Sequence, residues 1–426
     1  MNPAMMNPAM KLIALLAFAA FILASSHRVT AEPWPQYRGP AGDGVSTASI
    51  SDKPWGSSGP KVLWKAPTPL GFSSFAVADG RAITLVGEQE HEVCLALDAN
   101  TGKKLWEAQL GSIKYGRGGG DAGAPDNRGG DGPRGTPTIS GDRVFAYDAF
   151  MTLHCLDAET GQSLWKRDIE AEFEGRNIPW RNASSPIVDG NSVIVGGGGA
   201  GQSFLAFNKD DGQVLWKSGD ETITHATPCL AEINDRKQIV FFVTSGLVAV
   251  DVQSGEEIWR AKFPFSTSTA ASPVVEGDRV YCSAGYGVGA GLFKVTEKAE
   301  ATELWFKANE LMNHWSTPVV HDGHLYGIFE FKKYGRAPLQ CVNLATGEIK
   351  WKKGGFGPGN CIQVGNKIVA LSDAGEVVIV SARPDEYVEL ARADVVRGKC
   401  WSTPAFSNGR LYVRSTEEAA CIDLQD

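Results

Sequence analysis

Apolar and polar positions alternate along most of this chain in short runs that end at glycine-centred turns, the pattern of β-strands joined by tight turns. One run recurs at fixed spacing: an apolar strand closes on Asp or Asn, a Gly follows four residues later, and a Trp four residues after that. Asp and Asn accept hydrogen bonds within their own turn, and Gly tolerates the positive φ that the turn requires. The copies are Asp98/Gly102/Trp106, Asp157/Gly161/Trp165, Asn208/Gly212/Trp216, Asp251/Gly255/Trp259 and Asn343/Gly347/Trp351.

A second element precedes the Trp strand: Ser/Thr-Pro, with Val or Leu seven residues after the proline. Two strands joined by a tight turn fit this spacing, and Pro, which lacks an N–H, belongs at the start or free edge of a strand. Trp64 and Trp305 extend the Trp series, while Phe75 and Cys361 take the Pro position in divergent copies. The copies are Pro137/Val144, Pro186/Val193, Pro273/Val280, Pro318/Leu325 and Pro404/Leu411.

Together the two elements form a four-stranded unit, the size of a propeller blade. Inner strands start at residues 75, 137, 186, 228, 273, 318, 361 and 404, which gives eight copies. The last copy ends before any Trp strand, whereas residues 61–66 are a Trp strand with no blade of its own. The pattern therefore predicts an all-β chain: a single eight-bladed β-propeller of four-stranded antiparallel blades over residues 61–426, its ring closed by the N-terminal strand, which completes the last blade. The Gly/Asp-rich stretch 111–135 has no periodicity and is expected to be an inserted loop.

The N-terminus carries an export signal. Thirteen apolar residues, Leu12 to Ala24, precede the small-x-small cleavage site Val29-Thr30-Ala31, as in secretory signal peptides. The run is shorter than the about 20 residues that a membrane span needs, and no Cys follows it before Cys94, so neither a membrane span nor a lipid anchor is expected. Residues 1–31 are thus predicted to be a signal peptide and residues 32–60 a lead segment, in a protein of the periplasm or cell envelope.

Charge and cysteine usage narrow the picture further. The net charge is −8, and nucleic acid binding requires a Lys/Arg-rich face, so no nucleic acid partner is expected. Four of the eight Cys share one register on four different repeats. Equivalent positions on separate blades lie beyond the about 7 Å Cα limit for a disulfide, so buried thiols are expected. Cys361 and Cys400, near neighbouring inner strands, are left open as a pair.

The Ala-x-Asp-x3-Gly-x3-Trp repeat resembles that of the pyrroloquinoline-quinone (PQQ) propeller superfamily over residues 61–426, and the opening Trp34-Pro35-Gln36-Tyr37-Arg38-Gly39-Pro40 is similar to the lead of exported bacterial PQQ-like repeat proteins. The resemblance implies that each repeated Trp docks against the neighbouring blade. The residues so implied are Trp64, Trp106, Trp165, Trp216, Trp259, Trp305 and Trp351.

The resemblance also implies two functional classes. Periplasmic quinoprotein dehydrogenases hold PQQ with calcium above the ring centre, and the outer-membrane assembly factor is a non-catalytic lipoprotein propeller that organises partner proteins. This chain lacks the Cys-Cys dipeptide and the extra length of the dehydrogenases, and it lacks the lipidation Cys of the assembly factor. No residue of this chain therefore takes over the enzymatic role.

One group of residues outside the Trp register lies just before the Ser/Thr-Pro elements, where inner strands begin near the ring axis. Eight blades place these side chains around one mouth, and converging aromatic planes and cationic groups suit an anionic or sugar-like ligand. The alternative is structural: the Trp rings fill the channel mouth and the polar groups bond to strand ends. No catalytic motif or metal-ligand set accompanies them. The candidate ligand-binding residues are Arg134, Trp180, Arg181, Asn182, His225, His314, Trp315 and Trp401.

These patterns favour an exported, non-catalytic scaffold of the bacterial cell envelope, which binds other envelope proteins or a small anionic or sugar-like ligand. No cofactor is expected. The alternative is a PQQ-dependent oxidoreductase of alcohols or sugars, with PQQ and calcium as cofactors. A quinone site needs a carboxylate base, and no Asp or Glu stands in the two positions before any Ser/Thr-Pro pair, so the mouth is expected to lack one.

Overall fold

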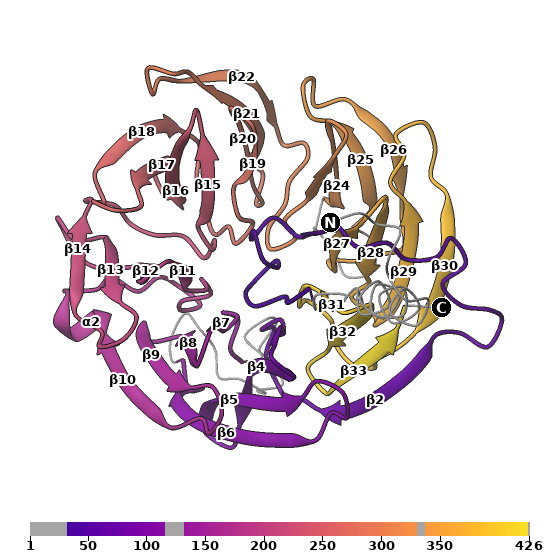
Figure 1. The fold of residues 1–426 in the computed structure, drawn as a ribbon. Helices are drawn as coiled ribbons and strands as arrows, with labels where there is room; N and C mark the ends of the chain where they lie inside the picture. Colours follow the sequence, from indigo (N-terminus) through magenta and orange to yellow (C-terminus); the bar gives the residue numbers. More distant parts are fainter. Residues whose placement is uncertain (1–31, 116–131, 330–336, 425–426) are drawn as a thin grey trace, which may run out of the picture. The chain divides into compact units, whose positions relative to one another are not determined.

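The computed structural model describes residues 32–115, 132–329 and 337–424, so the predicted signal peptide and residues 116–131 of the predicted loop insertion lie outside the described residues. Pro33–Asp426 form one compact unit. Within it, eight antiparallel sheets follow one another around a ring (Figure 1). This arrangement confirms the predicted all-β, eight-bladed propeller.

In blades 1 to 4 each strand pairs with the next along the chain, from the ring axis outward (Figure 1). Blade 1 contains β3 (Ala76–Ala78), β4 (Arg81–Glu88), β5 (His91–Asp98) and β6 (Lys104–Ser112); blade 2 contains β7 (Thr138–Ser140), β8 (Arg143–Tyr147), β9 (Thr152–Asp157) and β10 (Ser163–Asp168); blade 3 contains β11 (Ile187–Asp189), β12 (Ser192–Gly196), β13 (Phe204–Asn208) and β14 (Val214–Ser218); blade 4 contains β15 (Cys229–Ile233), β16 (Arg236–Val243), β17 (Gly246–Asp251) and β18 (Glu257–Lys262).

Blades 5 to 8 repeat the arrangement, and the last takes its outer strand from the N-terminal part of the chain. Blade 5 contains β19 (Val274–Glu276), β20 (Arg279–Ala284), β21 (Gly289–Val295) and β22 (Ala301–Ala308); blade 6 contains β23 (Val319–His321), β24 (His324–Ile328), β25 (Leu339–Asn343) and β26 (Ile349–Lys353); blade 7 contains β27 (Asn360–Val364), β28 (Lys367–Leu371), β29 (Glu376–Ser381) and β30 (Glu389–Asp394); blade 8 contains β31 (Ala405–Ser407), β32 (Arg410–Arg414), β33 (Glu418–Asp423) and β2 (Lys61–Pro67).

The ring closes through this N-terminal strand. β2 pairs antiparallel with β33, with Trp64 opposite Cys421, and the indigo-violet and yellow parts of the chain lie side by side there (Figure 1). The pairing covers an edge of β33 that would otherwise be open to association with other strands. The predicted closure of the ring is therefore confirmed.

Three details depart from a ring of uniform blades. β1 (Val45–Ser46) pairs in parallel with β27, so blade 7 has five strands. A short helix, α2 (Ile169–Glu172), follows β10, and the Asp168 side chain caps it by accepting a hydrogen bond from the Ala171 N–H. β6 runs to Ser112, so an ordered strand occupies the first positions of the predicted 111–135 insertion.

The lead segment 32–60 enters the ring instead of merely preceding it (Figure 1). Trp34 is fully buried, and its backbone exchanges two hydrogen bonds with Val77 of β3, at 2.8 and 2.7 Å. The Pro35 carbonyl accepts a hydrogen bond from the Ile139 N–H of β7 at 2.7 Å. The edge of an inner strand that faces the ring axis carries N–H and C=O groups that need partners, and the lead supplies some of them.

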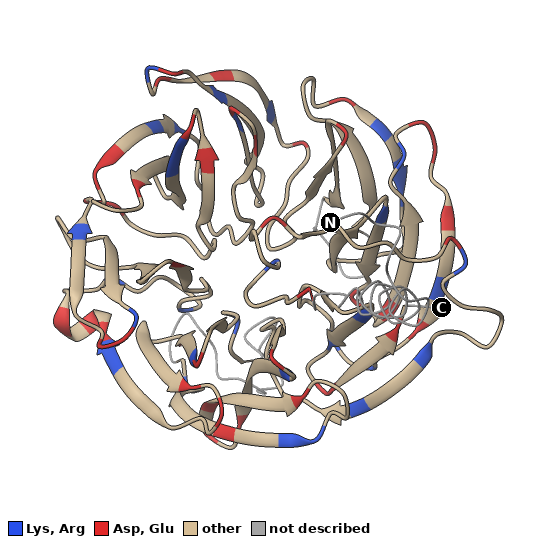
Figure 2. Ribbon diagram, in the orientation of Figure 1, with Lys and Arg blue, Asp and Glu red and all other residues tan. Residues whose placement is uncertain are grey.

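Apolar side chains fill the junctions between blades, while charges gather outside. One buried cluster joins Phe145 and Leu153 of blade 2 to Val193 and Phe207 of blade 3. Figure 2 shows acidic and basic residues interspersed along the outer strands, whereas the strands nearest the axis carry few charges. A charged side chain inside the ring is therefore exceptional and needs a structural or functional reason.

Candidate functional site

The repeated Trp side chains lie at the blade junctions. In six of the seven, the indole N–H donates to a backbone carbonyl of the following blade at 2.8–3.1 Å, as from Trp64 to Ala99 and from Trp106 to Ala158. The repeat Gly lies against the ring, since a Cβ on Gly102 would come within 2.7 Å of Trp64. The repeat therefore joins six of the eight blades to the blade that follows. The six Trp residues are Trp64, Trp106, Trp165, Trp216, Trp305 and Trp351.

Trp259 departs from this arrangement. Its indole N–H donates to the side-chain oxygen of Gln238 in its own blade at 2.6 Å, although the ring shares a buried cluster with Phe293 of the following blade. That following blade is the one whose repeat lacks the Gly, because Ala301 stands four residues before Trp305. Packing across the junction is kept while the hydrogen-bond acceptor changes.

Trp315 and Trp401 meet at the mouth of the channel. Their rings stack with centroids 4.2 Å apart and an interplanar angle of 30°, and Trp401 also stacks on Phe72, at 4.7 Å and 27°. His314 contacts Trp315 edge-on at 4.9 Å, and the Trp315 indole N–H donates to the Pro358 carbonyl at 2.8 Å. The stack links blades 6, 8 and 1 and fills this part of the mouth with aromatic rings.

The other predicted mouth residues lie at blades 2 and 3 and bond mainly to backbone. Arg134 donates to the Trp180 carbonyl at 2.8 Å, and Arg181 Nε donates to the Tyr115 carbonyl at 3.0 Å. Asn182 is buried and donates from its amide to carbonyls of the β8–β9 hairpin. Trp180 and Arg181 both adopt φ of 64°, a costly conformation for residues other than Gly. These contacts match the structural alternative of the sequence analysis for the polar groups.

His225 and His314 are buried and uncharged at neutral pH. His225 Nε2 lies 2.8 Å from the Pro179 carbonyl oxygen, and its Nδ1 lies 2.8 Å from the Ser268 hydroxyl. Burial lowers the pKa of His225 to about 4. Burial, together with the charge that His225 would carry, lowers the pKa of His314 to about 3. Neither imidazole therefore supplies positive charge to an anionic ligand at neutral pH.

A buried carboxylate, Glu92, interacts electrostatically with Arg134 and with a second buried carboxylate, Asp148, in a region where the sequence pattern predicts none. Glu92 of β5 accepts hydrogen bonds from the Tyr115 hydroxyl at 2.7 Å and from the Ala149 N–H at 3.1 Å. Burial, and then the charge of Asp148, raises the pKa of Glu92 to about 8, while Arg134 opposes the rise. The expectation that this region lacks carboxylates is therefore incomplete, because it counted only the residues next to the Ser/Thr-Pro pairs.

Glu92 could have been identified from the sequence by the alternation of side chains along its strand. Side chains two residues apart on a strand share a face, and Glu92 is in phase with Cys94 and Ala96, both fully buried. A carboxylate in that phase is buried and requires partners. Asp148 carries no comparable signal, since it stands in the turn before β9, where its carboxylate accepts from the Phe150 and Thr152 N–H groups.

The cysteines are separate thiols. All eight, including Cys361 and Cys400, are free, so the pair left open by the sequence is not joined. Across residues 32–115, 132–329 and 337–424, no group of three or more His, Cys, Asp or Glu is placed to ligate a metal. In the same ranges, no helix combines the length and apolar character needed to cross a membrane.

The chain is similar to named proteins in sequence and in structure. The outer membrane protein assembly factor BamB of Shewanella oneidensis is 25% identical over 236 residues, which span 51% of this chain and only 56% of that protein. BamB from Moraxella catarrhalis superposes with a TM-score of 0.59 at 15% identity, covering 85% of this chain and 97% of that one. The quinohemoprotein alcohol dehydrogenase from Comamonas testosteroni superposes with a TM-score of 0.66 at 13% identity, covering 96% and 82%. At such identities the structural likeness shows the propeller fold alone.

A family-level match goes further than these single relatives. The family described as outer membrane protein assembly factor BamB matches residues 89–353, more than half of the chain. The matched range holds all five complete copies of the Gly-Trp repeat, whose structural role is to join the blades. This chain therefore belongs to the outer membrane protein assembly factor BamB family of PQQ-like β-propellers.

Proposed function

We propose that this protein is a non-catalytic scaffold that organises partner proteins in the bacterial cell envelope. The relative in Shewanella oneidensis is named outer membrane protein assembly factor BamB, and the similar structure from Moraxella catarrhalis is also that of a BamB. The predicted signal peptide would direct this chain to the cell envelope, the compartment that those names indicate. Other outer-membrane assembly proteins are accordingly the proposed partners. The comparisons lend no support to a sugar-like ligand, and we propose none.

The main support for the scaffold proposal is the presence of exposed aromatic side chains at the rim of the mouth. Trp180 is 38% exposed and Tyr286 is 46% exposed. Each ring is held by a neighbour, Trp180 by His225 at a centroid distance of 6.4 Å and Tyr286 by His314 at 5.0 Å. Trp and Tyr dominate the energetics of protein interfaces, and rings that are already held lose little side-chain entropy on docking. The rim thus has the composition of a protein-docking surface.

A PQQ-dependent oxidoreductase is the second candidate, favoured by the likeness to quinohemoprotein alcohol dehydrogenase. The mouth does not fit the quinone. A flat cofactor needs a free aromatic face, and the central stack offers none at Trp401, which is stacked on both Trp315 and Phe72. The nearby carboxylate of Glu92 is fully buried and hydrogen-bonded to Tyr115. We therefore derive no redox step for this protein.

Photo-cross-linking tests the scaffold. A photo-reactive p-benzoylphenylalanine in place of Tyr286 should cross-link, in the cell that makes the protein, to one or a few envelope proteins. The control places the same residue at Leu164, which is 47% exposed on the outer strand β10. The Tyr286 adducts should be absent from the Leu164 variant and should weaken when Trp180→Ser is added. Identical adducts from both positions would contradict docking at the mouth.

The enzymatic alternative has its own test. The purified chain, incubated with PQQ and calcium, should show no dye-linked oxidation of alcohols or aldoses. Turnover that is abolished by Trp401→Ala or Arg134→Ala would overturn the scaffold proposal, because it would place a redox site at the mouth.

A further inference from the structure

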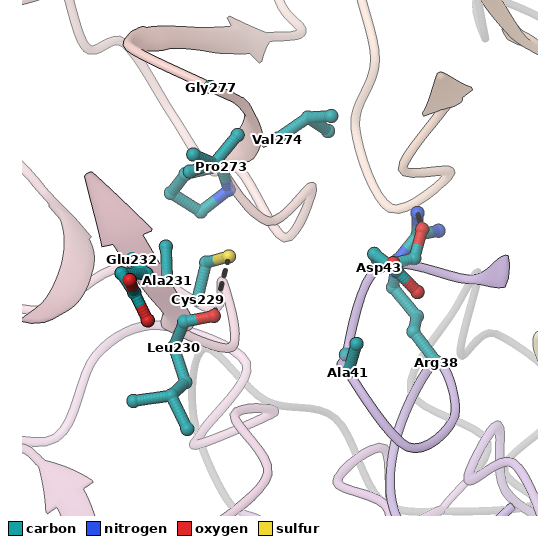
Figure 3. Close-up of a pocket in the computed structure, with 12 residues that line it drawn as sticks. Arg38, Ala41, Asp43, Cys229, Leu230, Ala231, Glu232, Pro273, Val274 and Gly277 are labelled. Carbon is teal, nitrogen blue, oxygen red and sulfur yellow. Dashed lines mark hydrogen bonds between the residues drawn. The ribbon is translucent and has the colours of Figure 1, made fainter. Parts of the chain in front are cut away.

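A cavity of about 190 Å³ lies inside the ring, between the lead segment and blades 4 and 5 (Figure 3). One wall is the lead around Ala41, and the others are the inner strands β15 and β19. Four consecutive residues of β15, from Cys229 to Glu232, line the space. The cavity therefore follows β15 along most of its length.

The edge of β15 beside this cavity presents backbone hydrogen-bonding groups. β15 is the last strand of its sheet and pairs on one side only, with β16. Asn234 and Asp235, the two residues of the turn between these strands, have φ of 51° and 57°, as in the type I′ turns whose flanking residues bond to each other. Ile233 therefore bonds to β16, and because hydrogen-bonded and non-bonded pairs alternate, Leu230 and Glu232 direct their N–H and C=O groups away from β16. Figure 3 shows the Leu230 carbonyl on the side of the cavity.

This edge is uncovered, whereas the lead covers the corresponding edge of blade 7. In the described part of the chain, the Leu230 carbonyl accepts one bond from outside the ladder, from the Cys229 thiol at 3.7 Å, and a thiol is a weak donor. β1 pairs with the inner edge of β27, and all five residues of β27 are buried. In β15 only Ile233 is buried. β15 thus has room for the kind of strand that the lead supplies to β27.

The side chains around the cavity restrict what can pair with β15. Ala41, Gly42 and Ala231 are small, but the volume equals the share of only about six water molecules in the liquid, so an added strand needs small side chains here. Glu232 lines the cavity, is exposed, and forms no ion pair within the described residues. Arg38 is 2% exposed and donates to backbone carbonyls instead. A basic residue of the added strand therefore has an acidic partner in Glu232.

We propose that β15 binds an extended segment of a partner protein, which adds to its open edge as a fifth strand of blade 4. The segment has small side chains and one basic residue, which lies beside Glu232. Its backbone exchanges hydrogen bonds with Leu230 and Glu232. Strand addition takes its affinity from main-chain hydrogen bonds and its specificity from the side chains around the edge. The inference rests on the proposed scaffold function and names the form in which one partner is recognised.

The probe is the capped pentapeptide Ac-Ser-Ala-Ser-Ala-Lys-NH2, with two forms that carry N-methyl groups either on both Ala or on both Ser. In an added strand only alternate N–H groups face β15. One form should therefore lose at least about tenfold in affinity, while the other binds within about threefold of the parent peptide. Isothermal titration calorimetry with the whole purified chain measures the three affinities. No binding of the parent peptide, or equal affinities for the two N-methylated forms, would overturn the proposal.

A variant of the opposite wall locates the peptide. Ala41 is exposed and lies across the cavity from β15 (Figure 3). Ala41→Leu should narrow the space and weaken peptide binding at least about tenfold without lowering the Tm. Ala171→Leu, on the exposed face of α2, is the matched control and should bind as the parent does. Unaltered peptide binding by Ala41→Leu would contradict the location.

The ion pair is tested at Glu232. Glu232→Gln should weaken the peptide about two- to fivefold, as for an exposed ion pair, and should not affect a peptide with Gln in place of Lys. Glu256→Gln, at an exposed turn of the same blade, is the control. Equal effects of Glu232→Gln on both peptides would contradict the pairing. Tyr286 does not line this cavity, so Tyr286 cross-links without peptide binding would reject strand addition alone, and peptide binding without those cross-links would reject docking at the mouth alone.

Discussion

At the scale of single residues, four blade junctions depend on a Gly that leaves room for the Trp of the preceding blade: Gly102, Gly161, Gly212 and Gly255. Gly255 adopts φ of +72°, and a Cβ there would lie 2.4 Å from the Trp216 ring. Gly is therefore required at this position for two reasons: the backbone has a positive φ, and the Trp ring leaves no room for a Cβ atom. The spacing between Gly and Trp in the repeat is fixed because the turn at the Gly determines where the Trp on the following strand lies.

Two Gly→Ala variants separate these requirements. Gly277→Ala should cost only the backbone strain, about 1–2 kcal/mol, because φ is +59° and nothing lies within 4 Å of the added Cβ. Gly255→Ala should cost a further 1–3 kcal/mol, roughly, from overpacking against Trp216. Urea unfolding measures both. Equal losses would show that the Trp does not need the glycine.

The Trp residues themselves should behave as independent units. Trp165→Ala and Trp351→Ala should each lower the free energy of unfolding by about 3–5 kcal/mol, since both remove a ring and its hydrogen bond to the next blade. The double variant should equal the sum to within about 0.5 kcal/mol, because the two junctions share no partner. A large coupling energy would mean that the junctions are not separate.

At the scale of elements, one buried group ties strand β5 to the base of the inserted loop. Glu92 accepts from Tyr115, just before residues 116–131, and from Ala149 in the β8–β9 turn. The protonated carboxyl keeps both contacts and adds no charge beside Asp148. Since its pKa is raised to about 8 in the fold, the folded chain holds a proton that the unfolded chain releases.

Stability should therefore fall as pH rises toward 8 on account of Glu92. Its contribution is complete below the unfolded pKa of 4.5 and is lost as pH approaches 8. Glu92→Gln mimics the protonated group, so between pH 6.5 and 8 the variant should gain about 2 kcal/mol relative to the parent. The pKa values of His225 and His314 are lowered to about 4 and about 3, so these two stay neutral above pH 6.5 and do not contribute to the change. Glu159→Gln, at an exposed turn, is the control, and parallel pH profiles for Glu92→Gln and the parent would refute the assignment.

At the scale of the whole molecule, two segments of the N-terminal part of the chain, β2 and the lead segment, hold the ring together. β2 supplies the outer strand of blade 8, and the Trp64 indole N–H reaches Ala99 in blade 1 at 3.0 Å. The lead before it crosses the channel and buries Trp34 against blade 1. A terminal segment of this kind is a structural part of the propeller, unlike the loosely attached ends of most domains.

Deletion of residues 32–66 should therefore destabilise the protein far more than the loss of a tail. Removal of one buried Trp costs about 3–5 kcal/mol, and the deletion removes two together with a strand. The control, Lys61→Ala with Lys65→Ala, breaks only exposed ion pairs to Asp423 and Glu418 and should cost less than about 1 kcal/mol. Thermal unfolding decides. A Tm within a degree or two of the parent would mean that the ring closes by other means.

The sequence by itself determined the fold, including its closure. The Gly-Trp and Ser/Thr-Pro spacings are local, and each copy specifies the same four strands, so eight copies lead to a ring without any long-range information. The unmatched Trp strand at residues 61–66 then identified the element that closes it. The mouth residues were located because they precede strands whose position in the ring was already known.

Only the tertiary structure decided what those residues do. The stacking of Trp401 between Trp315 and Phe72, and the burial of His225 and His314, depend on distances between blades that no spacing along the chain encodes. The same holds for the lead segment, which has no repeat of its own. Arg38 meets the Thr317 carbonyl 279 positions away, and such contacts exist only once the ring has brought distant strands to a common axis.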